Sequence, residues 1–206
     1  MTTLPDPQRR AIAAAAISAA RAMRHLSTGA MAELRRMDGA NPAPAFWRIA
    51  VRNPLMMDDQ ADWVTILRIL ALLTPKGEPP PEGRPLLHNP ARPFGRVLCD
   101  GGDPAWQPQG DSPDGVVSER RLVQLLATRG PARAVALERA ARRLAPRIQP
   151  GSGVDVAQIA LALLVLLAFV GGAFVKNFDQ FIEHFHLFFW LVVTPDLTTF
   201  TPPACS

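Results

Sequence analysis

The chain has 206 residues, 48% of them hydrophobic, so it can bury the core of one sizeable domain or two small ones. Its two cysteines, Cys99 and Cys205, are too few for a disulfide framework and form no CxxC motif that would indicate structural zinc. The N-terminal sequence MTTLPDPQRR lacks the basic and apolar regions of a signal peptide, so we expect a cytoplasmic protein.

The formal net charge of +4 conceals a segregation of charge along the chain. Residues 1–52 carry eight arginines and three acidic residues, and residues 119–147 carry eight arginines and two acidic residues. The segments 53–118 and 148–206 are acidic on balance. Two basic blocks around an acidic region favour a polyanionic partner. Nearly every basic residue is arginine, however, and the codon bias of a GC-rich genome has the same effect.

The first 75 residues predict an N-terminal helical lobe. We predict two helices over residues 8–26 and 29–37, the second capped by Thr28 and ended by Asp38-Gly39. Prolines place Phe46 and Trp47 at the start of another helix. Residues 60–73 predict a strongly apolar helix. The positions expected to face inward in the first and last of these helices are Ile12, Ala16, Ala19, Met23, Leu26, Trp63, Ile66, Leu67 and Leu70.

Residues 76–116 predict a Pro- and Gly-rich connection and loop, with helix only after Pro93. A C-terminal helical lobe follows over residues 117–170. No apolar alternation of period two lasts long enough to predict a sheet. The expected fold is therefore all-α, a two-lobed helical bundle followed by a divergent apolar tail over residues 171–206.

Residues 117–148 predict a helical hairpin in which Ser118 caps the first helix and Gly130-Pro131 begins the second. The second helix has an apolar stripe of Leu137, Ala141, Leu144 and Ile148, opposite a basic face of Arg139, Arg142, Arg143 and Arg147. Neighbouring guanidiniums repel one another unless a polyanion meets them, and arginine binds phosphate bidentately. This face indicates a nucleic-acid backbone surface; a solvated Arg-rich face is the alternative.

The apolar run 156–175 has twenty residues, long enough to span a bilayer. The alternative is a buried bundle helix over residues 154–169, after a turn at 151–153. No cluster of positive charge at either end would fix the orientation of a span.

Catalytic and metal-binding constellations are weak. His184 and His186, beside Asp179 and Glu183, are two residues apart and would face apart on a helix. The loop aspartates do not match the calcium loop of an EF-hand and are typical turn formers; they are Asp100, Asp103, Asp111 and Asp114. The nucleotide and nucleophile motifs GxxxxGK[ST], GxGxxG and GxSxG are missing. We therefore expect a protein that is not an enzyme and has no cofactor or metal. A small metal-dependent enzyme using residues 179–186 is a weaker alternative.

Three patches occur in an order typical of one family. They are PAFWRIAV at 44–51, RPFGRVLCDGGDPAW at 92–106 and VSERRLVQLLATRGPARAVALERAARRLA at 117–145. With ELRRM at 33–37 and GSGVDVAQIALALL at 151–164, they resemble the CasB family, the small subunit of the type I-E CRISPR complex Cascade. The resemblance covers roughly residues 8–164.

The resemblance implies a non-catalytic, all-α subunit that associates with a second copy of itself and with other Cascade subunits. Such a subunit faces the duplex of crRNA and target DNA and the displaced DNA strand, and so stabilises the R-loop. The nucleic-acid-binding role falls on Arg35, Arg36, Arg96, Arg120, Arg121 and Arg139, with Arg142 and Arg143 added by helical geometry.

The C-terminus departs from the family, whose last helix is polar and basic. After residue 165 this chain is apolar and contains no arginine. Either a reading-frame change near residue 165 or an unusual natural terminus would explain this departure. The alternative function is a membrane-anchored helical adaptor whose basic lobes bind anionic lipid or RNA, but the family resemblance makes a membrane partner less expected.

Overall fold

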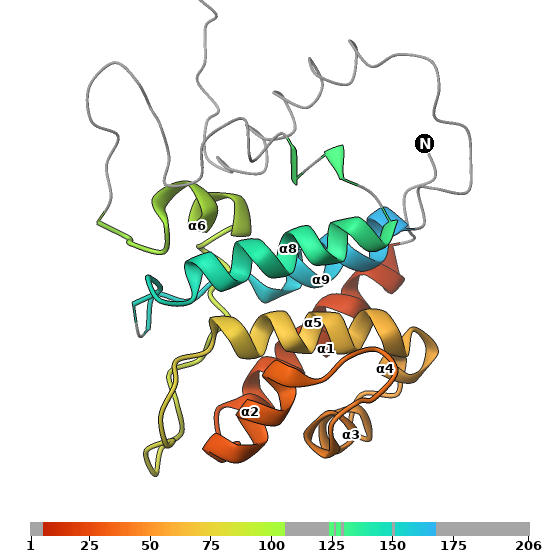
Figure 1. Cartoon of the computed structure of the whole chain (residues 1–206), viewed down its shortest axis with the longest axis horizontal. Helices are drawn as coiled ribbons and strands as arrows, with labels where there is room; N and C mark the ends of the chain where they lie inside the picture. The colour runs from red at the N-terminus through yellow and green to blue at the C-terminus, as the bar shows by residue number, and fades with distance from the viewer. Residues whose placement is uncertain (1–5, 106–123, 126, 129, 150, 168–206) are drawn as a thin grey trace, which may run out of the picture. The chain divides into compact units, whose positions relative to one another are not determined.

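The computed structural model describes residues 6–105, 124–125, 127–128, 130–149 and 151–167. These residues form helices and no strand (Figure 1). An isolated β-bridge among them joins His88 and Val154. The all-α prediction is confirmed. The helices are α1 (Asp6–Met23), α2 (Thr28–Arg36), α3 (Pro44–Ala50), α4 (Leu55–Asp58), α5 (Gln60–Leu73), α6 (Phe94–Asp100), α8 (Gly130–Leu144) and α9 (Val156–Leu167).

Helix α5 has the bounds that its apolar pattern predicts, Gln60–Leu73. Its predicted inward residues Trp63, Ile66, Leu67 and Leu70 are all fully buried. Burial extends almost around the helix, because α5 packs against α1, α2, α8 and α9. An apolar surface on all sides is what a helix at the centre of a bundle requires.

Helices α1 and α9 pack against each other, although their sequences lie far apart. The buried face of α1 is mostly alanine, with Ala16 and Ala19 completely buried, and small side chains allow a neighbouring helix to approach closely. From α9, Val156, Ile159 and Leu163 enter the core. The helix predicted within residues 154–169 is thus observed as a packed element.

The two predicted lobes share one core. Helix α8 packs on α5, and α9 packs on both α1 and α5. Buried side chains from all these helices belong to a single hydrophobic cluster. The described residues all lie in one compact unit, Met1–Gly172. The lobe boundaries at residues 75, 116 and 170 stay predictions.

The connection between α5 and α6 contains no helix, as expected, and α6 begins just after Pro93. Backbone hydrogen bonds hold the connection in place. The Arg84 amide donates to the Arg24 carbonyl over 3.0 Å, and the Val154 amide donates to the Leu87 carbonyl over 2.7 Å. Gly153 lies at φ +64°, and a Cβ there would be 2.7 Å from the Leu87 carbonyl oxygen, so the crossing requires glycine.

Helix α2 and its cap both lie one residue earlier than predicted. Thr28 is the first helical residue, and the Ser27 hydroxyl accepts a hydrogen bond from the Ala30 amide at 3.3 Å. Serine and threonine are both good N-caps, so adjacent residues of these types do not distinguish the cap by sequence.

Candidate nucleic-acid interface

Helix α8 has the two faces that its sequence predicts. Leu137, Ala141 and Leu144 are buried against the core, and Ile148 packs partly against it. The arginines of the opposite face are exposed: Arg139, Arg142, Arg143 and Arg147. The first helix of the predicted hairpin and its cap, Ser118, lie largely outside the described residues.

Glu138 divides these arginines into two kinds. Its carboxylate accepts hydrogen bonds from Arg142 Nε at 3.0 Å and Arg142 Nη2 at 2.6 Å. The other carboxylate oxygen accepts from Arg68 of α5. Within the described part of the chain, neither Arg139 nor Arg143 pairs with a carboxylate. Two guanidiniums of α8 are therefore free to meet an anion, and Arg142 is held beside them.

Arg68 also joins the two basic blocks of the sequence. Its Nη1 donates to the Met37 carbonyl over 3.0 Å, while its Nη2 meets Glu138. Met37 follows the last residue of α2, Arg36, which is exposed. The basic end of α2 and the basic turn of α8 thus lie against the same guanidinium.

Arg96 is carried by α6 and is exposed. The loop after α6 reaches the turn after α8, where a Cβ on Gly102 would lie 2.9 Å from the Ile148 side chain. Gln149 Nε2 donates to Asp103 Oδ1 over 3.4 Å at the same place. The end of α6 therefore meets the chain just beyond the arginines of α8.

Arg35 has a different environment from its neighbour Arg36. Its Nε donates to the Ala71 carbonyl over 2.9 Å, and its Nη2 donates to the Thr74 carbonyl over 3.2 Å. Both carbonyls belong to the C-terminal end of α5, where helix carbonyls lack intrahelical partners. Burial, and then the nearby Arg84 guanidinium, lower the pKa of Arg35. Two of the three Arg35 guanidinium nitrogens thus already donate within the fold.

Arg120 and Arg121 lie outside the described residues, so their predicted role stays a prediction. Sequence reasoning missed Arg68 and Glu138. The signal that could have found them was Arg68 itself, because a charge in the middle of an otherwise apolar helix requires a partner.

Other kinds of site find little support among the described residues. Asp100 pairs with Arg92 at 2.6 Å, and Asp103 caps a turn by accepting from the Ala105 amide. The described part of the chain contains no group of three or more residues that could hold a metal ion. Residues 179–186, Asp111 and Asp114 lie outside the described residues.

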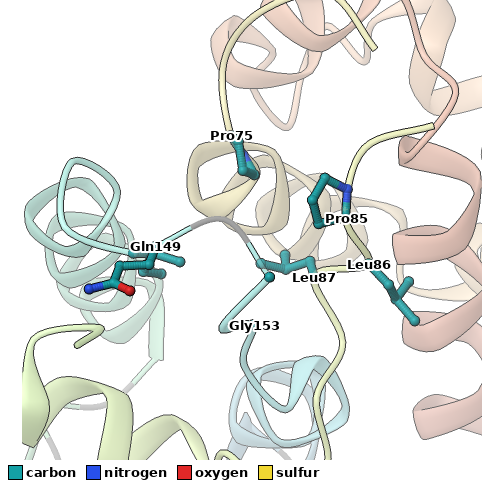
Figure 2. A pocket seen from close by; sticks show the side chains of 8 residues that line it. Pro75, Pro85, Leu86, Leu87, Gln149 and Gly153 are labelled. Carbon is teal, nitrogen blue, oxygen red and sulfur yellow. The ribbon is translucent and has the colours of Figure 1, made fainter. Parts of the chain in front are cut away.

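A small cavity where the α5–α6 connection meets the loop before α9 is lined by Pro75, Pro85, Leu87 and Gly153 (Figure 2). Its volume of about 10 Å³ suits one water molecule rather than a ligand. None of the described helices is long and apolar enough to cross a membrane.

The family of CRISPR-associated protein Cse2 matches residues 30–167 of this chain. The chain belongs to the Cse2 family. Cse2, also called CasB, is the small subunit of type I-E Cascade, so the chain is a CRISPR Cascade subunit and the resemblance stated from its motifs is confirmed. The match ends at Leu167, the last residue of α9, and it leaves out α1. No curated protein and no solved structure matches the chain.

Proposed function

We propose that this Cse2-family subunit is non-catalytic and that it binds the backbone of nucleic acid through the exposed side of α8. Its ligands are the displaced DNA strand and the duplex of crRNA and target DNA, and its binding stabilises the R-loop. We define the α8 basic surface as Arg36, Arg139, Arg142 and Arg143.

The observation that carries the proposal is the exposure of Arg139 and Arg143 without a carboxylate partner in the described residues. They are four residues apart, so one turn of α8 presents both guanidiniums on one side. Phosphate contacts by arginine supply affinity without reading sequence, which suits a subunit whose complex reads sequence by base pairing.

Arg36 extends this surface because Arg68 holds the end of α2 beside Glu138. Arg96, exposed on α6, is a further candidate, because the loop after α6 meets Ile148 just beyond α8. Arg35 does not carry the proposal, since two of its guanidinium nitrogens already donate to carbonyls of the fold.

The test is a titration of the full chain with single-stranded DNA and with RNA at several salt concentrations. Replacing Arg139 and Arg143 together with glutamine keeps a helix-forming side chain and removes both charges. We expect weaker binding, and a log–log salt slope that flattens by roughly 0.7 for each phosphate of a single strand that is no longer neutralised.

The matched control replaces Arg9 and Arg21 of α1, which are also exposed, with glutamine. It removes the same charge elsewhere, and we expect a smaller effect on affinity and slope. Equal losses in the two double variants would show that net charge alone drives binding, and an unchanged α8 variant would refute the proposed surface. Vesicles of anionic lipid, titrated in parallel, test the adaptor alternative.

A further inference from the structure

Helix α3 carries an aromatic side chain that the core covers only in part. Phe46, Ile49 and Ala50 are buried, whereas Trp47 is 37% exposed and Val51, one turn later, is 80% exposed. Because Trp47 is only partly covered while its neighbour Phe46 is fully buried, part of the indole remains accessible to a ligand.

The indole ring of Trp47 is held in place by a neighbouring aromatic ring. It packs edge to face on the buried ring of Phe46, with centroids 5.2 Å apart and planes at 84°. Such pairs are favourable beyond their buried area. A ring fixed before binding loses little conformational freedom when a partner stacks on it.

Two arginines accompany this ring. Arg48 and Arg52 are exposed and four residues apart, and neither makes an ion pair or hydrogen bond through its guanidinium in the described part of the chain. The nearest downstream carboxylates in the sequence, Asp58 and Asp59, are exposed and form no ion pair with Arg48 or Arg52. An exposed aromatic ring and uncompensated guanidiniums on one short segment of chain match the chemistry of a nucleotide, which has a flat π-face and a charged phosphate.

We propose that Trp47 is a stacking platform for one unpaired base, with Arg48 and Arg52 binding the phosphates on either side of it. We define this site as the α3 platform. The proposal rests on the proposed function for the class of ligand, and it adds a second site that contacts a base rather than the backbone alone. The ligand is single-stranded, because a paired base keeps its faces stacked within the duplex.

The position of α3 allows both sites to serve one strand. Helix α3 packs against α2, and α2 ends at Arg36 of the α8 basic surface. A protein partner is the less favoured occupant, because the exposed large hydrophobic residues near Trp47 are only Val51 and Met57 among those described. A stable protein interface needs a larger buried core.

The experiment uses the full chain and two DNA strands of equal length, oligothymidine and the same backbone with abasic sites. The abasic strand keeps every phosphate and lacks the stacking partner. We expect Trp47→Ala to weaken binding to oligothymidine by roughly 5- to 100-fold and to leave binding to the abasic strand unchanged. Trp47→Phe keeps an aromatic face and should retain most of the affinity.

The arginines should behave differently from the ring. Replacing Arg48 and Arg52 with glutamine should flatten the salt slope for both strands by roughly 0.7 for each phosphate that no longer has an arginine partner. Ultraviolet crosslinking of the unaltered protein to oligothymidine, mapped by mass spectrometry, should yield an adduct at Trp47 and keeps the test decisive if an alanine variant misfolds.

Four outcomes would overturn the platform. Equal losses on both strands would show that Trp47 acts through the fold. Unchanged nucleic-acid affinity, with self-association abolished instead, would assign Trp47 to a protein partner. If the Arg139 and Arg143 variant loses binding while every α3 variant binds normally, the platform fails and the proposed function stands. Failure of the unaltered chain to bind any single strand would overturn both.

Discussion

Glu138 is the only carboxylate among the described residues of α8, and it meets guanidiniums from two helices. The Arg68 side chain is 23% exposed and the Glu138 side chain 12% exposed, so their charges depend on each other more than on water. Arg142, at 55% exposed, remains in contact with solvent. One acidic residue therefore stabilises the α5–α8 contact and positions a member of the basic surface at the same time.

We expect Glu138→Gln to lower the free energy of unfolding by about 2–4 kcal/mol, because Arg68 would be left partly buried without a counter-charge. The matched control, Arg142→Gln, removes the more exposed partner of the same carboxylate and should cost less than about 1 kcal/mol. Urea unfolding of both variants measures the difference. Similar losses would mean that Glu138 acts through its surface pair rather than through Arg68.

Adjacent residues show where sequence-based prediction of the site ends. Arg35 and Arg36 are identical in type and both follow Leu34 in ELRR, yet Arg35 donates to the end of α5 and Arg36 faces solvent. Helical periodicity separates the two faces of one helix. Which arginine makes hydrogen bonds within the fold depends on the element that packs beside the helix. Arg35 could not be distinguished without the position of α5.

At the scale of single helices, the sequence was more informative. The bounds of α5 and its four inward residues follow from its apolar pattern, and three of four residues of the α8 stripe are buried as predicted. These properties are local, since they depend on residues three or four positions apart. The pairing of α9 with α1 is not local, and no periodicity within either helix specifies the other.

The stripe of α8 provides a prediction at this scale. Leu144 is 1% exposed, so Leu144→Ala should lower the free energy of unfolding by about 2–5 kcal/mol through reduced burial and the cavity left behind. Val135, on the same helix, is 46% exposed, and Val135→Ala should change it by less than about 1 kcal/mol. Thermal and urea unfolding of the two variants provide the comparison. If Leu144→Ala unfolds like the wild type, the face of α8 that carries Leu144 is not the buried one.

For the whole molecule, the contact between α1 and α9 determines which part of the chain is needed to complete the core. Val156, Ile159, Ala160 and Leu163 are buried in that core with residues of α1 and α5. Removing α9 would uncover the alanine face of α1 and part of α5 together. Large exposed apolar patches of this kind lead to aggregation.

We therefore expect a chain that ends at Gly153 to aggregate or to lack a cooperative unfolding transition. The matched control ends at Gly171 and keeps all of α9, and we expect it to fold and to bind nucleic acid. Size-exclusion chromatography, thermal melts and the single-strand titration compare the two fragments. A folded, binding-competent fragment ending at Gly153 would contradict the role assigned to α9.

The contact between α1 and α9 also affects how the nascent chain folds during synthesis. Helix α1 leaves the ribosome before its partner α9, which begins more than 130 residues after α1 ends. At ordinary rates of synthesis, α1 waits on the order of ten seconds or longer before α9 emerges. During that interval its alanine-rich face offers few large apolar groups to chaperones or neighbouring chains. The alanine-rich face of α1 therefore exposes little surface for non-native hydrophobic contacts before α9 is synthesised.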